Sequence, residues 1–342
     1  MMLWFDAIEI PILIYAIIFT CYYFKKQKMI KLNNNEILVV ISSYELEDFI
    51  VENIKRIKKE FKQVVVLTVK DNGVKIDGVD IIKTPKDFKC MSIRKGRDLL
   101  YFARNYKVPS EVKYILFLDE DSYPEIPIEI PDRDVVLLFE TPHNCKRKDI
   151  MITEMQRLGF SLEEKLFLDL RLVFYLWGGG LLIKKEYLKY IPDYPTIIED
   201  TVYGWMLLKT DATFGKSFTR VHSLPPSDLK SMYKQRARWL MGTIFDLNLA
   251  PWYLRILTSI RIFYWLFSLI IFIFCDWWVK LLIFIVFFIQ SLIVCRLCNY
   301  PKYYALFWIV GAILNTSMAW TSPFIQRKRT FNVTKKCVPK SR

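Results

Sequence analysis

The chain has 342 residues, of which 53% are hydrophobic and 16% aromatic, and its formal net charge at pH 7 is +14. This charge does not indicate a nucleic-acid partner, because the basic residues form no stripe on a recognisable binding motif. They gather beside apolar segments, at 25–31 and 327–336, a pattern that anionic lipid headgroups explain better. With only two histidines and seven scattered cysteines, a structural metal site is not expected.

The N-terminal segment 3–24 is mostly apolar and is followed at once by Lys25, Lys26 and Lys28. About 20 apolar residues can cross a bilayer as a helix. A cleaved signal peptide carries its positive charge before the apolar run, whereas here the charge follows it. The pattern therefore predicts a retained anchor at 1–28. Lysines behind the anchor predict that the next domain lies in the cytoplasm.

Strands and helices alternate in the next part of the chain. Strands are expected at 36–44, 64–69, 114–118 and 134–139, and helices at 45–61 and 93–106. This alternation predicts an α/β domain over 29–250, with a mostly parallel sheet covered on both faces. Ligands of such sheets bind at the carboxyl ends of the strands, so the residues that follow each strand are the candidates for a site.

From about Pro251 the sequence becomes very apolar. Segment 251–263 spaces arginines among bulky apolar residues, as an interfacial helix does, and the apolar stretches 262–275, 277–295 and 303–320 predict membrane helices within 251–325. The tail, 326–342, is strongly basic and so is expected in the cytoplasm. If the domain at 29–250 and the tail both lie in the cytoplasm, the chain between them crosses the membrane an even number of times. One of the three apolar stretches is therefore expected to be interfacial or re-entrant, and 262–275 is the shortest.

Two acidic pairs follow apolar residues. Asp119 and Asp121 come directly after the strand at 114–118, where their carboxylates can point at one site with a hard divalent cation. Glu199 and Asp200 follow two isoleucines. The alternatives are an ordinary acidic loop for the first pair and a favourable helix N-terminus for the second.

Three successive glycines, Gly178, Gly179 and Gly180, follow Trp177. Glycines are costly in backbone entropy and are kept where the chain must bend or let a ligand approach. Trp177 offers a flat face for a sugar ring. The alternative is a simple tight turn.

The segment QRARW at 235–239 precedes the apolar C-terminal part. On a helix, Gln235, Arg238 and Trp239 share one face. The guanidinium could hold a phosphate bidentately while the indole faces an amphipathic partner. The alternative is anchoring at the membrane interface by arginine and tryptophan.

In this order and spacing, the motifs resemble those of membrane-integrated family 2 inverting glycosyltransferases, which are related to cellulose, hyaluronan and chitin synthases and to egghead-type β-mannosyltransferases. The resemblance covers 36–242 and the flanking membrane helices, and it implies a GT-A fold. It extends to the tail, where FNVTKK at 331–336 fits the FxVTxK gating loop of cellulose synthases. The residues that match this loop are Phe331, Val333, Thr334 and Lys336.

The resemblance also implies roles for individual residues. It makes Asp200 the general base and places Mn²⁺ or Mg²⁺ at Asp119 and Asp121. Donor binding is expected from Asp71, Lys95, Asp119, Gln235 and Arg238, and acceptor binding from Trp177, Gly178, Gly179, Glu199 and Trp239.

The chain departs from the family pattern in several places. It has a single Asp71 where the family usually shows two aspartates, and its match at 95–99 is partial. It also has fewer apolar segments than synthases with secretion channels, which puts polymer extrusion in doubt but not sugar transfer.

The leading interpretation is an enzyme that moves a sugar from a UDP- or GDP-linked donor to a lipid-linked or oligosaccharide acceptor at the membrane, forming a β-glycosidic bond. One alternative is a processive polysaccharide synthase, which product length would distinguish. Another is a non-catalytic membrane scaffold that retains the fold, but it leaves the joint presence of these motifs unexplained.

Overall fold

The computed structural model describes residues 22, 27–70, 73–143, 145, 147–274, 276–328 and 336. Most of the predicted N-terminal anchor at 1–28 lies outside the described residues. So do Asp71 and, in the predicted gating loop, Phe331, Val333 and Thr334.

The centre of the molecule is an eight-stranded sheet with the order β4-β3-β2-β5-β9-β8-β10-β6. Its strands are β2 (Ile37–Glu45), β3 (Gln63–Lys70), β4 (Asp80–Lys83), β5 (Tyr114–Asp119), β6 (Tyr123–Pro124), β8 (Val135–Pro142), β9 (Leu181–Lys184) and β10 (Phe214–Ser223). Strand β9 is antiparallel to β5 and β8, and β6 is antiparallel to β10, while the other pairings are parallel. The prediction of a mostly parallel sheet is confirmed. A separate pair, β1 (Met29–Lys31) and β7 (Glu129–Pro131), is antiparallel.

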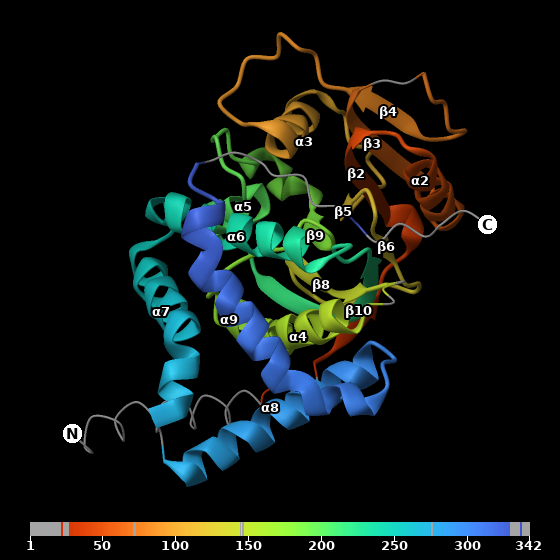
Figure 1. The fold of residues 1–342 in the computed structure, drawn as a ribbon. Coiled ribbons are helices and arrows are strands. Elements are labelled where there is room, and N and C mark those ends of the chain that lie inside the picture. The colour runs from red at the N-terminus through yellow and green to blue at the C-terminus, as the bar shows by residue number, and fades with distance from the viewer. Residues whose placement is uncertain are drawn as a thin grey trace.

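Helices cover both faces of this sheet (Figure 1). On one face, α2 (Asp48–Glu60) buries Ile50, Ile54 and Ile57, which share one side of the helix. On the other face pack α3 (Arg94–Asn105) and α5 (Glu199–Leu207). Because both faces are covered, the central strands are continuous apolar runs rather than alternating ones.

Helix α4 (Lys148–Asp169) is one of the elements that the sequence patterns left unassigned. It packs against β8 and β10 on one side and against α8 (Trp277–Leu297) and α9 (Trp308–Ile325) on the other. Helix α4 therefore joins the sheet domain directly to the apolar C-terminal helices. The remaining helical elements are α6 (Leu229–Asp246), α7 (Trp252–Phe274) and the short 3₁₀ turns η1 (Asn34–Glu36), η2 (Lys185–Tyr190), η3 (Leu247–Leu249) and η4 (Lys302–Phe307).

Helix α7 differs from the prediction, which separated an interfacial helix at 251–263 from an apolar stretch at 262–275. No glycine or proline interrupts Trp252–Phe274, so the two segments form one continuous helix. Arg255 is exposed and donates to the Ala250 carbonyl at 2.7 Å, while Arg261 lies 3.5 Å from the Glu163 carboxylate.

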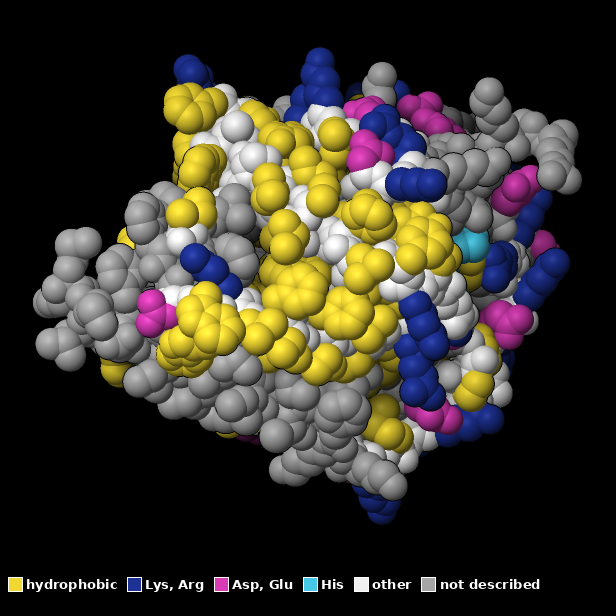
Figure 2. Space-filling view, turned by 60° about the horizontal axis from the view of Figure 1, so that its bottom comes forward, with side chains coloured by type: hydrophobic (Ala, Val, Ile, Leu, Met, Phe, Trp, Pro, Cys, Tyr) yellow, Lys and Arg dark blue, Asp and Glu magenta, His cyan; other side chains and the backbone are white. Residues whose placement is uncertain are grey.

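Two segments among the described residues are long and apolar enough to cross a membrane, Trp277–Leu297 and Lys302–Ile325. Several of their polar side chains are buried against the protein, and many of their apolar side chains are exposed. The buried polar residues include Gln290, Ser291, Asn315, Thr316 and Ser322, and the exposed apolar ones include Trp277, Leu281, Ile285, Ile313 and Phe324. Figure 2 shows the resulting hydrophobic face, with lysine and arginine at its border. This polar-inside arrangement is suited to an apolar surrounding.

Candidate functional site

Three segments that are far apart in the sequence meet at the carboxyl end of β5. Asp119 ends that strand, Lys95 lies in the first turn of α3, and Glu199 begins α5. Lys95 Nζ lies 2.5 Å from Asp119 Oδ1 and 3.8 Å from Glu199 Oε1. The structure thus brings predicted donor and acceptor residues together at the edge where ligands of parallel sheets bind.

The glycine run after Trp177 is explained by what surrounds it. A Cβ at Gly178 would lie 2.4 Å from Lys95 Nζ and 3.3 Å from Asp200 Oδ2, and one at Gly179 would lie 3.3 Å from Asp119 Oδ2. Any side chain at Gly178 would push the lysine and the carboxylate apart. Gly178 and Gly179 therefore bring the backbone close to the charged groups, whereas a Cβ at Gly180 would meet the apolar side chains of Val221 and Leu138.

Asp200 is held by the backbone. Its Oδ2 accepts from the Gly178 N–H at 2.7 Å and its Oδ1 from the Thr201 N–H at 2.8 Å. Burial, followed by the negative charge of Glu199, raises the pKa of Asp200 to about 7, although Lys95 opposes this. A carboxylate with a pKa near neutrality can accept a proton at the pH of a cell and release it afterwards.

Asp119 and Asp121, the predicted metal ligands, each face a lysine. Burial acts to raise the pKa of Asp119, but the ion pair with Lys95 outweighs it, so the pKa lies below its usual value. Asp121 is buried, and this raises its pKa although Lys336 Nζ lies 2.7 Å from Oδ2. Lys336 is the residue of the predicted gating loop that the structure describes, and it also donates to the Leu224 carbonyl at 2.9 Å.

The carboxylate oxygens of Asp119 and Asp121 suit a hard divalent cation. Among the described residues, no group of three or more His, Cys, Asp or Glu side chains could hold a metal ion. Asp119 and Asp121 would therefore supply two oxygen ligands and leave the others to phosphate oxygens and water, the arrangement typical of Mg²⁺ with nucleotides. Both carboxylates already carry a cationic partner, which shows that this position attracts positive charge.

Arg238 faces the same carboxylates from α6. Its Nη1 donates to the Ile197 carbonyl at 3.3 Å. Burial lowers the pKa of the guanidinium, while the charges of Glu199, Asp200 and Asp119 oppose the shift. Gln235 is also buried, and its Oε1 accepts a long hydrogen bond of 3.5 Å from Arg236 on the same helix. Arg238 thus belongs to the charged site, whereas Gln235 contacts its own helix.

Trp177 and Trp239 form one aromatic unit beside the charges. Their ring centroids are 4.8 Å apart at 65°, and Trp177 Nε1 donates to Glu164 Oε1 at 2.7 Å. The guanidinium of Arg236 lies 4.4 Å from the Trp239 ring. Trp177 and Trp239 are both half-buried, so this contact leaves part of each ring accessible.

A buried network of charged residues supports this aromatic unit, and the sequence patterns did not identify it. Lys216 Nζ lies 2.5 Å from Glu164, and Glu154 accepts from Arg157 at 2.7 Å and from Arg236 at 2.5 Å. The sequence feature that could have indicated this network is the helical spacing of the charged residues at 154, 157 and 164 within an otherwise apolar segment. Charges so placed in a buried helix need partners, and those partners come from β10 and α6.

No protein-family model matches the chain, and no curated protein matches it in sequence. Among solved structures, it is similar to the mannosyltransferase PcManGT from Pyrobaculum calidifontis in complex with GDP-Man and Mn²⁺, with a TM-score of 0.49 and 11% identity over 94% of this chain and 96% of that one. It is also similar to a mycobacterial protein, with a TM-score of 0.34 and 17% identity over 55% of this chain. The chain spans 65% of the length of that protein. At these values, neither similarity transfers a ligand or an activity to this chain.

Proposed function

We propose that the chain is an inverting glycosyltransferase, which moves a sugar from a nucleotide-sugar donor to a membrane-associated acceptor and forms a β-glycosidic bond. The observation that supports this most strongly is the meeting of Asp119, Lys95, Asp200 and Arg238 at one edge of the sheet. Carboxylates for a cation, fixed positive charge for a diphosphate and a carboxylate with a raised pKa are the groups that such a transfer needs.

The donor diphosphate binds beside Arg238 and Lys95. Negative charge grows on the diphosphate as the glycosidic bond breaks, and two cations fixed in place stabilise that charge without reorganisation. Arg238 stays charged because its guanidinium has a very high intrinsic pKa. A Mg²⁺ or Mn²⁺ ion held by Asp119 and Asp121 would supply further neutralisation of the phosphates as a Lewis acid. Lys336 would have to leave Asp121 when that ion binds, since both use the same carboxylate.

Asp200 acts as the general base. The acceptor hydroxyl oxygen attacks the anomeric carbon while the bond from that carbon to the diphosphate oxygen breaks. The hydroxyl proton passes to the Asp200 carboxylate, and the nucleoside diphosphate leaves with the electron pair. One displacement inverts the anomeric carbon, so an α-linked donor gives a β-linked product. The N–H groups of Gly178 and Thr201 fix the carboxylate for this task.

The acceptor reaches the site past Trp177 and Trp239, which lie next to Asp200 through the Gly178 backbone. A flat aromatic surface suits the apolar face of a sugar ring. The exposed apolar side chains of α7, α8 and α9 support an association of these helices with lipid. We propose that residues 1–28 anchor the chain, that 29–250 form the cytoplasmic catalytic domain and that 251–325 associate with the membrane. The tail at 326–342 then acts as a gating loop over the donor.

Detergent-purified protein would be incubated with Mn²⁺ or Mg²⁺, a membrane lipid extract and radiolabelled UDP-glucose, UDP-N-acetylglucosamine or GDP-mannose. We expect label from one donor in the lipid or glycan fraction, released by a β-specific but not by an α-specific glycosidase. An α-linked product would contradict the single displacement, and absence of transfer from every donor would contradict the proposed function. The length of the product separates single transfer from processive synthesis.

A further inference from the structure

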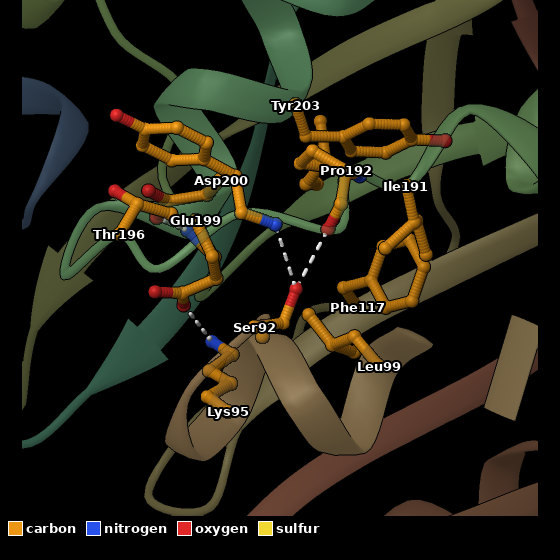
Figure 3. A pocket seen from close by; sticks show the side chains of 14 residues that line it. Ser92, Lys95, Leu99, Phe117, Ile191, Pro192, Thr196, Glu199, Asp200 and Tyr203 are labelled. Atoms are coloured by element: carbon orange, nitrogen blue, oxygen red, sulfur yellow. Dashed lines mark hydrogen bonds and ion pairs between the residues drawn. The ribbon is translucent and has the colours of Figure 1, made fainter. Parts of the chain in front are cut away.

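A small cavity lies directly behind the charged groups of the site (Figure 3). It has a volume of ≈ 20 Å³ and lies between α3, the Gly178 backbone, the loop that precedes α5, and α5 itself. A single water needs about 10–15 Å³ on the same measure, so the cavity holds a group of roughly the size of a methyl. Its inner wall is made by Leu99, Phe117, Ile191 and Pro192.

The uncharged polar side chains that line the cavity already have hydrogen-bond partners. Ser92 Oγ donates to the Pro192 carbonyl at 2.9 Å and accepts from the Tyr194 N–H at 3.0 Å. Tyr203 donates to the Tyr187 carbonyl at 2.7 Å, and Thr196 donates to Asp246 at 2.6 Å. The wall therefore presents carbon to the cavity. An apolar cavity of this kind does not favour water, and a hydroxyl placed there would lose its hydrogen bonds.

The rim of the cavity is charged. Lys95, Glu199 and Asp200 line it on the side of the site (Figure 3). Under the proposed function, the transferred sugar lies between the diphosphate-binding Lys95 and the base Asp200, so the cavity opens toward that sugar and not toward the nucleotide base. A substituent that enters it must combine a polar portion at the rim with an apolar end.

We propose that this cavity receives the acetamido group of the donor, so that the enzyme transfers an N-acetylhexosamine. The acetamido N–H donates to a rim carboxylate, its carbonyl accepts from Lys95, and its methyl fills the carbon-lined interior. A sugar with a hydroxyl at the same position leaves the interior empty. This inference rests on the proposed function and names its substrate class.

Gly96→Ala fills the cavity from its own wall. Gly96 lines the cavity, and a Cβ there would lie 3.4 Å from Glu199 Cβ and 3.9 Å from Ser92 Cβ, which are ordinary contacts. Alanine also favours the helix over glycine, so the variant is expected to fold. Gly159→Ala in α4 is the matched control, because its Cβ would meet only Gln290 Oε1 at 3.9 Å. Leu99→Phe is a second variant that fills the cavity from another side.

Calorimetric binding with Mn²⁺ would compare donor pairs that differ only in the acetamido group: UDP-N-acetylglucosamine with UDP-glucose, and UDP-N-acetylgalactosamine with UDP-galactose. GDP-mannose would be included. In the wild type we expect the N-acetylated member of one pair to bind about tenfold or more tightly. Gly96→Ala and Leu99→Phe abolish this preference and retain the affinity for the unsubstituted sugar, whereas Gly159→Ala behaves as the wild type.

The results that would overturn the acetamido proposal differ from the result that would overturn the proposed function. Three results would overturn the acetamido proposal and leave the proposed glycosyltransferase function intact. They are equal binding within each pair, a preference for GDP-mannose, and a preference that Gly96→Ala and Leu99→Phe both leave unchanged. Absence of binding by every nucleotide sugar would overturn both.

Discussion

Two clusters of charged residues lie close together in this protein but are built differently: the edge cluster is half-buried, whereas the α4 network is buried. The edge cluster consists of Lys95, Asp119, Glu199, Asp200 and Arg238, and the α4 network consists of Glu154, Arg157, Glu164, Lys216 and Arg236. In the α4 network every carboxylate has a cation at 2.5–2.7 Å. In the edge cluster, Asp200 accepts only from backbone N–H groups among the described residues, and its pKa is raised to about 7.

The difference separates a structural role from a chemical one. In the α4 network the charged side chains are paired with one another, which stabilises packing. In the edge cluster, Asp200 is held by backbone N–H groups and can take up a proton, and Lys95 can turn from Asp119 to a phosphate. Perturbed pKa values of this kind are typical of functional sites. The two clusters should therefore respond to mutation in opposite ways, the α4 network through stability and the edge cluster through turnover.

The largest effect on stability is expected from Glu154→Ala. The change leaves Arg157 and Arg236 buried without their shared carboxylate, which should lower the free energy of unfolding by about 3–5 kcal/mol in chemical denaturation. Glu36→Ala is the control, because its pair with Lys113 is largely exposed and should contribute little. A Glu154→Ala protein as stable as the wild type would show that the network does not hold the fold.

Arg238→Ala should act on turnover instead. Loss of a fixed positive charge on the leaving diphosphate is expected to lower kcat by about 10²–10³-fold with little change in stability. Arg238→Lys keeps the charge but not the guanidinium fork, so it should recover only part of the activity. If both variants turned over donor at the wild-type rate, the phosphate role of Arg238 would be wrong.

The pH dependence of the activity is expected to follow the ionisation of the Asp200 carboxyl. Only the ionised carboxylate accepts a proton, so activity should fall as the pH drops below about 7, by roughly tenfold per unit. Glu199→Gln removes a negative neighbour that helps to raise this pKa, so the acidic limb of the profile should move to lower pH. A limb that stayed in place in Glu199→Gln would assign the titration to another group.

A smaller effect is expected at the aromatic unit. Trp239→Phe keeps an aromatic ring but weakens the contact with Trp177, and the acceptor KM should rise about two- to tenfold with kcat nearly unchanged. Trp252→Phe on the exposed side of α7 is the matched control and should leave the acceptor KM unchanged. Equal effects of the two changes would indicate a general response of the membrane-facing helices rather than acceptor binding.

The sheet could be predicted because its central strands are uninterrupted apolar runs. The observed β2, β3, β5 and β8 lie within a few residues of the expected segments. The antiparallel β9 was not predicted, since the four residues Leu181–Lys184 are too short for a periodic signal and their pairing depends on distant strands.

The residues of the proposed site could be selected from the sequence by type, but their pairings could not. Asp119, Asp200 and Arg238 stood out as charged residues beside apolar runs, and the structure places them together. The pair of Lys336 with Asp121 joins the C-terminal tail to the residues after β5, and no local pattern specifies such a contact. The role of α4 was missed for a related reason: its charges look like a solvated face until the partners on β10 and α6 are known.

The most direct test is release of nucleoside diphosphate from the preferred donor, with metal and lipid extract, by the wild type and by Asp200→Asn. The two side chains have the same shape, but only the carboxylate can accept the acceptor proton. We predict that the variant binds the donor and releases nucleotide at least about 10²-fold more slowly. Equal release by the two proteins would show that Asp200 is not the base and would contradict the assignment of the edge cluster as the catalytic site.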